Sequence, residues 1–269
     1  MKKILTILAA MMMLLMPMAF SDSATMTVNV GNTAPTVDNL VINSINTGAT
    51  VAPNPGAVKT VSVEAEASDE NGHGDISSVS CAITGHGTIT LSAGTIVDPT
   101  TRTYTGSFDM NFYDDPSTYE VTCTATDASA QTGNRMESFA YQTSIALELD
   151  AALIGFADMS ASETKTITGD NVMTTPLLPS VQNYGNVQID AEVTGTDLTD
   201  GGKTIAVGKA EFRFGVEAFA DLSTTTQTAH INMGKAADSI KNVDFKLTIP
   251  EGTLSGSYSG TVTITAVSG

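Results

Sequence analysis

Apolar and polar residues alternate with a period of two along most of the chain after residue 21, and no stripe of helical period interrupts them. Successive side chains of a β-strand point to opposite faces, so such a run predicts a strand with one buried and one solvated face. In three runs of the first half, apolar residues occupy every second position, so that they share one side of the predicted strand (one parity). These runs are Val61, Val63, Ala65 and Ala67; Val79, Cys81 and Ile83; and Tyr119, Val121, Cys123 and Ala125. The pattern predicts an all-β fold.

The second half carries the same alternation in four further runs. These are Val187, Ile189, Ala191 and Val193; Phe212, Phe214 and Val216; Val243, Phe245, Leu247 and Ile249; and Val262, Ile264 and Ala266. Turns rich in Gly, Pro, Asn and Asp separate the runs, which is typical of antiparallel sandwiches and not of alternating strands and helices. With Glu137–Ser144 as the passage between halves, we expect two tandem β-sandwich domains, residues 22–142 and 143–269.

The N-terminus has the pattern of a secretory signal peptide. Two lysines precede an apolar run from Ile4 to Phe20, and small residues then favour cleavage after Ser21. An uncleaved membrane anchor is the alternative interpretation. We expect residues 1–21 to be removed, which leaves no membrane-spanning segment and an extracellular or cell-surface protein.

Charge and composition exclude two classes of function for this protein. The 269 residues include 12 Lys+Arg against 29 Asp+Glu, for a net charge of −17. Nucleic-acid binding is excluded because it requires a cationic surface. A zinc or redox framework is excluded because the chain has only two cysteines.

Residues 32–142 contain Asn32-Thr-Ala-Pro-Thr-Val37, Ala67-Ser-Asp-Glu-Asn-Gly72 followed by Asp75-Ile76, and Tyr119-Glu-Val-Thr-Cys-Thr-Ala-Thr-Asp127. In these motifs the segment resembles the immunoglobulin-like and cadherin-like domains of secreted prokaryotic surface proteins. The resemblance implies a β-sandwich and an extracellular setting, and it carries no catalytic residue.

The second half contains Gln182-Asn-Tyr-Gly-Asn186, Ile249-Pro-Glu-Gly-Thr253 and Gly256-Ser-Tyr-Ser-Gly-Thr-Val-Thr-Ile-Thr265. It resembles the second domain of secreted archaeal and bacterial envelope or fibre proteins, some of which assemble by donating a strand to a neighbour. The resemblance implies a second β-sandwich and a role at the cell surface.

Cys81 and Cys123 both lie on the apolar parity of their strands, and an oxidising compartment favours a disulfide between them. If the two strands are the neighbouring C and F strands implied by the immunoglobulin-like resemblance, the bridge is a cross-strand link within one sheet. Two buried free thiols are the alternative.

The acidic loop Asp69-Glu-Asn-Gly-His-Gly-Asp75 predicts a calcium site. Calcium takes six to eight oxygen ligands, and carboxylates and amides on a glycine-bent loop can supply several. We expect Asp69, Asn71 and Asp75, joined by Asp127 from a later strand, to be its ligands. The alternative is a solvated turn built around Asn71-Gly72.

The sequence gives no support to an enzyme. The three histidines are scattered, and neither a GxSxG nor an HExxH motif occurs. We expect a secreted, non-enzymatic structural protein of an envelope layer, appendage or extracellular filament, whose partners are its own copies or other surface proteins. The alternative is an adhesin that binds a glycan or protein at its loop tips, with Tyr104, Phe112 and Tyr113 as a loose aromatic cluster.

The segment Ala24–Val30 (ATMTVNV) alternates Thr and Asn with apolar residues. It can be the first strand of its own domain, or a flexible strand that joins the sheet of a neighbouring subunit.

Overall fold

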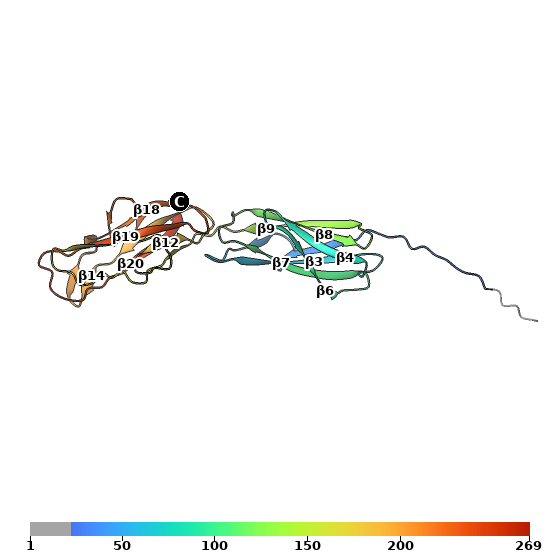
Figure 1. Cartoon of the computed structure of the whole chain (residues 1–269), viewed down its shortest axis with the longest axis horizontal. Coiled ribbons are helices and arrows are strands. Elements are labelled where there is room, and N and C mark those ends of the chain that lie inside the picture. Colours follow the sequence, from blue (N-terminus) through green and yellow to red (C-terminus); the bar gives the residue numbers. More distant parts are fainter. Residues whose placement is uncertain (1–22) are drawn as a thin grey trace, which may run out of the picture. The chain divides into compact units, whose positions relative to one another are not determined.

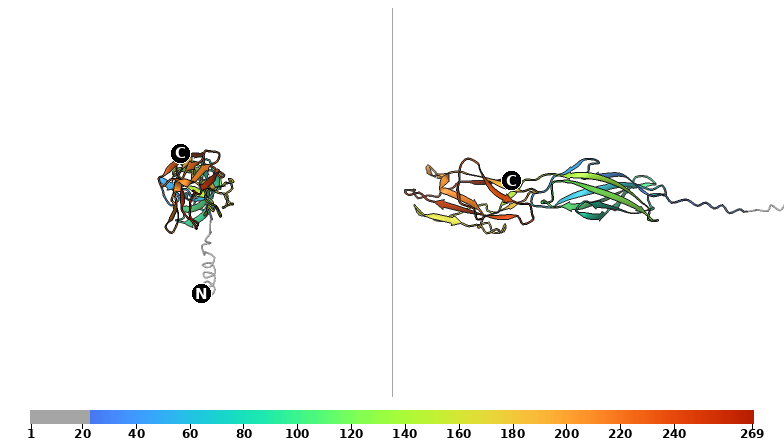
Figure 2. Two further views of the ribbon diagram at one scale, coloured as in Figure 1. Left: turned by 90° about the vertical axis from the view of Figure 1, so that its left-hand side faces the viewer. Right: turned by 90° about the horizontal axis from the view of Figure 1, so that it is seen from above.

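The computed structural model describes residues 23–269, and the predicted signal peptide lies outside them. Its secondary structure is all-β, with one short 3-10 helix, η1 (Val207–Lys209), as the exception among the described residues. In the coloured part of Figure 2 no helix packs on either face of a sheet. The predicted fold class is therefore confirmed.

The first sandwich packs two sheets on one core (Figure 1). One sheet has the order β1 (Thr36–Ile42), β3 (Lys59–Ser68), β7 (Thr101–Met110), β6 (Ser92–Ile96). The other has the order β2 (Ala49–Val51), β9 (Thr132–Tyr141), β8 (Thr118–Asp127), β4 (Ile76–Ile83), β5 (Gly87–Thr90). All pairs are antiparallel except β2 with β9. The predicted apolar positions of β3, β4 and β8 are buried, apart from the half-buried Tyr119, because each sheet turns one parity toward the other sheet.

The second sandwich has a larger and a smaller sheet. The larger has the order β10 (Leu147–Leu149), β12 (Ser180–Asn183), β19 (Ile240–Thr248), β16 (Ala210–Phe214), β17 (Ala220–Asp221), and β11 (Thr164–Ile167) also pairs with β19. The smaller has the order β18 (Gln227–Met233), β13 (Ile189–Gly195), β20 (Val262–Ser268), and a separate hairpin joins β14 (Leu198–Asp200) to β15 (Lys203–Ile205).

Five apolar positions of the second half, predicted to be buried in strands, are placed differently by the structure. Val187 precedes β13 and belongs to no strand. Val216 is exposed because β16 ends at Phe214 and the chain turns at Gly215, which has a φ of 60°. The apolar residues of β20 are only half-buried, since β20 pairs with β13 and with no strand on its other side in the described chain.

Thr33–Gly269 forms one compact unit that contains both sandwiches. The core of the first ends at Tyr141, and the apolar residues packed on the second begin at Leu147. The predicted domain boundary between 142 and 143 stays a prediction.

Candidate functional site

Three carboxylates meet at one end of the first sandwich. Asp69 follows the last residue of β3, Asp75 precedes β4, and Asp127 is the last residue of β8. Because β4 and β8 are neighbours that pair Ile76 with Asp127, their ends coincide. The three side chains each bring an oxygen within 4.8 Å of the others.

Two of these acids are almost completely buried, since Asp69 and Asp127 are each 2% exposed. Asp69 Oδ1 accepts the Asn71 N–H at 2.7 Å, whereas Asp69 Oδ2 is buried and has no hydrogen-bond partner. Asp127 Oδ1 accepts the N–H groups of Ser129 and Gln131, both at 2.8 Å. The backbone geometry thus fixes one oxygen of each buried carboxylate and leaves Asp69 Oδ2 for another partner.

Carboxylates brought together in this way repel one another, and burial strengthens the repulsion. A divalent cation with oxygen ligands would relieve it. Ca²⁺ binds oxygens at 2.3–2.6 Å, so two ligands on one ion can lie up to about 5 Å apart, which is compatible with the observed spacing. The structure brings three of the four predicted ligands together, and calcium itself stays a prediction.

Asn71, the fourth predicted ligand, holds the start of the compact unit. Its side-chain Oδ1 accepts the backbone N–H of Thr33 at 2.8 Å, and the neighbouring Glu70 accepts the Thr33 hydroxyl at 3.5 Å. The loop that carries the acids is therefore also the loop that secures Thr33, three residues after Val30.

Cys81 and Cys123 form a disulfide. They are directly opposed in the antiparallel pair of β4 and β8, and both are fully buried. The bridge is the predicted cross-strand link within one sheet, and neither cysteine is a free thiol.

The segment Ala24–Val30 is not a strand of its own domain. The structure assigns no strand between residues 23 and 35, and β1 begins at Thr36. The apolar side chains of one parity are exposed to solvent: Met26 by 95%, Val28 by 85% and Val30 by 80%. The structure thus contradicts the first-strand interpretation and leaves a strand-like apolar row without a partner among the described residues.

The second sandwich has an incompletely covered core. Twelve apolar residues are only partly buried against it, compared with two in the first sandwich. Along β20, Val262, Ile264 and Ala266 belong to this group. A groove of about 1000 Å³ borders the start of β20, with Leu149, Ile154, Phe156, Leu247 and Ile249 in its lining.

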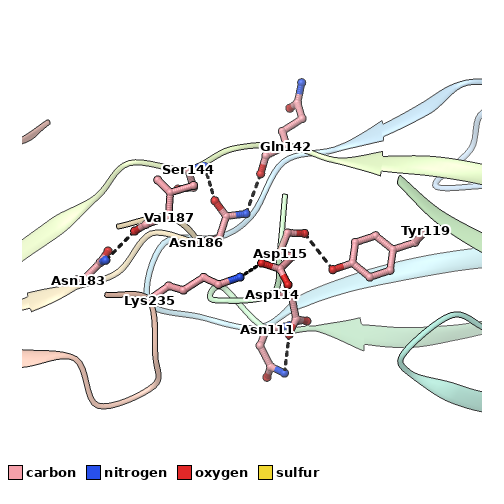
Figure 3. Close-up of polar contacts among 10 residues, drawn as sticks. All are labelled: Asn111, Asp114, Asp115, Tyr119, Gln142, Ser144, Asn183, Asn186, Val187 and Lys235. Carbon is pink, nitrogen blue, oxygen red and sulfur yellow. Dashed lines mark hydrogen bonds and ion pairs between the residues drawn. The ribbon is translucent and has the colours of Figure 1, made fainter. Parts of the chain in front are cut away.

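The Asn186 side chain holds the segment that connects the two sandwiches by two hydrogen bonds, which we call the Asn186 clamp (Figure 3). The Asn186 side chain is fully buried, accepts the Ser144 N–H at 2.7 Å and donates to the Gln142 carbonyl at 2.9 Å. Beside it, Lys235 forms an ion pair with Asp115 (Figure 3). No local signal in the sequence indicates that Asp115 has a partner 120 residues away.

Tyr141, the last residue of β9, lies next to this clamp. Its hydroxyl donates to the Asn111 carbonyl at 3.0 Å. Burial, followed by the nearby Asp114 and Tyr119, raises the pKa of Tyr141 to about 12. The phenol therefore stays neutral and keeps donating at physiological pH.

Two of the three histidines, His86 and His230, each lie beside an aspartate. His86 lies 3.6 Å from Asp114 and against the rings of Phe108 and Tyr119, and the exposed His230 lies 2.7 Å from Asp190. In the described chain no hydrogen bond joins either imidazole to a Ser or Cys side chain.

Of the three aromatic residues predicted to form a loose cluster, two are buried and Tyr113 is half-buried. Tyr104 is buried in the first core, and the buried Phe112 packs edge-on against Tyr113 and Tyr184. Separately, none of the helices in the part of the chain described here is long and apolar enough to span a membrane.

No protein-family model matches the chain, and no curated protein matches it. Several solved structures overlap with it at low similarity. Latent PorU from Porphyromonas gingivalis has 14% identity and a TM-score of 0.32, with 87% of this chain and 20% of that chain covered. This chain therefore spans about a fifth of PorU.

Two further structures cover similar shares of this chain. The CsuC–CsuE chaperone–tip adhesion subunit complex of Acinetobacter baumannii has 8% identity and a TM-score of 0.37, with 87% and 99% covered. The C-terminal domain of the antigen I/II-family protein AspA of Streptococcus pyogenes has 10% identity and a TM-score of 0.28, with 87% and 95% covered. At these values the similarities carry no argument about activity or partners.

Proposed function

We propose that this chain is a secreted, non-enzymatic structural subunit of the cell surface, and that copies join when Ala24–Val30 of one completes the second sandwich of another. The observation that carries the proposal is the half-covered core along β20. An open strand edge beside exposed core residues is a template for an added strand.

Donor and acceptor match in length and in pattern. Both Ala24–Val30 and β20 have seven residues, which is about 23 Å of extended chain. The donor places Met26, Val28 and Val30 on one parity, and β20 places Val262, Ile264 and Ala266 on one parity with Thr between them. A donor strand that pairs along β20 with Met26, Val28 and Val30 on the core side would extend the apolar face over the groove. Its Thr and Asn side chains would remain in solvent.

Burial of the donor side chains supplies the driving force. Complete burial of a Val or Met is worth about 1.5–3 kcal/mol, so three contribute roughly 4–9 kcal/mol before the costs of association. The main-chain hydrogen bonds along β20 add to this gain and fix the register.

Electron microscopy of residues 22–269 tests the proposal, with ordered polymers as the expected result. Val28→Asp is expected to abolish them because it places a charge in the acceptor core. Its matched control, Thr27→Asp, is expected to assemble because that side chain faces solvent in the same strand. A synthetic ATMTVNV peptide is expected to cap the acceptor and block growth.

Monomeric wild-type protein, or equal assembly by Val28→Asp and Thr27→Asp, would overturn strand donation. A monomer that binds a glycan array would instead support the adhesin alternative. Two of the three aromatic residues considered for that alternative, Tyr104 and Phe112, are buried, so they do not favour it.

A further inference from the structure

We propose that residues 151–157 are a displaceable cover over the groove of the second sandwich, and that a donor strand moves this cover aside when it pairs with β20. We call these residues the strap. Release of the strap is a property of the single chain, and only its effect on assembly rests on the proposed function.

The strap has the side-chain alternation of a strand but none of the hydrogen bonds of one. It lies between β10 and β11 and is assigned to no strand. Its side chains Ile154 and Phe156 are half-buried against the second core, whereas Leu153 and Ala157 are exposed. No hydrogen bond within the described chain involves any strap residue. Apolar contacts therefore hold the strap in the groove.

Hydrogen bonds anchor the chain on either side of the strap. Before it, the Asp150 N–H donates to the Ser180 carbonyl at 3.1 Å, and Asp150 Oδ1 accepts the Ser180 N–H at 2.8 Å. After it, the Lys165 ammonium donates to the Asp158 carbonyl. Between these anchors the strap can leave the groove without breaking a hydrogen bond in the described chain, and segments of this kind open at low free energy.

The strap covers the groove without filling it. All seven strap residues line its volume of about 1000 Å³, together with Phe245 and Leu247 of β19 and Val262 of β20. Protein interiors seldom leave such space, because they are packed as densely as organic crystals, and an unfilled volume forgoes dispersion contacts. Ala157 adds backbone strain, since its φ of 53° lies in a region that an L-residue seldom adopts.

The strap and the donor strand need the same apolar surface. Val262, the first residue of β20, lines the groove that the strap covers. The strap places Ile154 and Phe156 there without main-chain pairing, whereas a donor supplies three apolar side chains and pairs along β20. The exchange therefore favours the donor. Because binding that requires an open state is weakened by the fraction of open molecules, the stability of the strap controls how readily copies join.

A single introduced thiol can report release of the strap, because both native cysteines are in the disulfide. Ile154→Cys places the thiol on the side of the strap that packs on the core, so its rate of reaction with a maleimide increases with release. The measurement uses residues 22–269 carrying Val28→Asp, which removes strand donation and keeps the chain single.

Phe156→Ala is expected to raise this rate by about fivefold or more, because it removes the largest apolar side chain of the strap. Leu177→Ala is the matched control, because Leu177 is 80% exposed in a different loop, and the rate is expected to stay unchanged. Val193→Cys, at a fully buried position of β13, tests whether the sandwich itself opens. Phe156→Ala is expected to leave the Val193→Cys rate unchanged.

A fluorescent ATMTVNV peptide tests displacement, with fluorescence anisotropy as the measure of its binding. Bound peptide is expected to raise the Ile154→Cys rate toward that of Leu153→Cys, whose position is 73% exposed while the strap is in place. Peptide that binds while the Ile154→Cys rate stays constant or falls would overturn displacement and leave strand donation standing.

Equal rates in Phe156→Ala and Leu177→Ala would overturn release of the strap, as would equal acceleration at Ile154→Cys and Val193→Cys. Absence of peptide binding would refute strand donation and the role of the strap in it. In that case an accelerated Ile154→Cys rate in Phe156→Ala alone would still support release of the strap in the single chain.

Discussion

Replacing Asn186 by Ala should loosen the connection between the two sandwiches while leaving each folded. The side chain holds the connecting segment from both sides, because it accepts the Ser144 N–H and donates to the Gln142 carbonyl. The Asn186 backbone N–H also donates to the Ser144 carbonyl, and the substitution leaves that bond in place. The experiment therefore isolates the contribution of the side chain.

Each lost hydrogen bond costs about 0.5–1.5 kcal/mol, so the two together lower the local stability by about 1–3 kcal/mol. Gln142 is exposed and its carbonyl can turn to water, which places the cost nearer the lower end. Since 1.4 kcal/mol corresponds to a factor of ten, amides of residues 142–146 should exchange about 5-fold to 150-fold faster.

Hydrogen–deuterium exchange read by mass spectrometry measures this effect peptide by peptide. Peptides from β4 and β13 should keep their wild-type rates. Asn46→Ala is the control, because it removes an exposed amide contact with Asn39 far along the chain from the clamp. A change of less than twofold at residues 142–146, or equal acceleration throughout the second sandwich, would refute the clamp.

Three further predictions concern stability. Replacing Cys81 and Cys123 by Ala opens a loop closed over 42 residues and should lower the free energy of unfolding by about 4 kcal/mol in urea titrations; a loss below about 1 kcal/mol would contradict the loop-entropy argument. Burial raises the pKa of Asp190, but hydrogen bonds from the Asn232 N–H and His230 outweigh it and lower the pKa below 3.8. Because the pKa of Asp190 is lower in the folded than in the unfolded protein, its carboxylate stabilises the fold above pH 3.8, and this stabilisation is lost as the pH falls through the folded-state pKa. Asp190→Asn should therefore make the free energy of unfolding depend less on pH in urea titrations between pH 2 and 6. A Cβ at Gly133 would lie 2.0 Å from the Pro35 carbonyl oxygen, so Gly133→Ala should cost about 1–3 kcal/mol by thermal unfolding, whereas Gly234→Ala, with open space around it, should be nearly neutral.

Much of the fold follows from the period-two pattern, because a sheet buried on one face selects one parity over a whole strand. That is why the apolar residues of β3 and the pairing of Cys81 with Cys123 could be predicted from sequence. The pattern does not show where a strand ends, as Val216 illustrates. It also does not show whether a neighbouring strand covers the face, which is why β20 is only half-buried.

The acidic cluster could be predicted in part because its members adjoin strand ends, and neighbouring strands bring their ends together. The burial of Asp69 and its unpartnered oxygen depend on how the loop packs, which the sequence does not specify. The Asn186 clamp could not be predicted, because both partners of the Asn186 side chain lie more than 40 residues earlier and both are backbone groups. An Asn before a strand resembles any turn residue until its surroundings are known.

The contrast between the two cores determines what kind of assembly strand donation would produce. The first core is crosslinked and almost fully buried, whereas apolar residues along β20 are only partly buried, so under the proposed strand donation each copy would supply one donor segment and use β20 as its acceptor edge. These are different surfaces, and a contact between different surfaces is heterologous. A heterologous contact does not satisfy both partners in a pair, because the second copy still carries an exposed donor and the first an open acceptor. Repetition of the contact therefore gives a ring if the rotation closes and a filament if it does not. A stable two-fold symmetric dimer in which the β20 strands of two copies pair with each other would contradict this reasoning. Such a dimer would cover the acceptor edge without using Met26, Val28 or Val30.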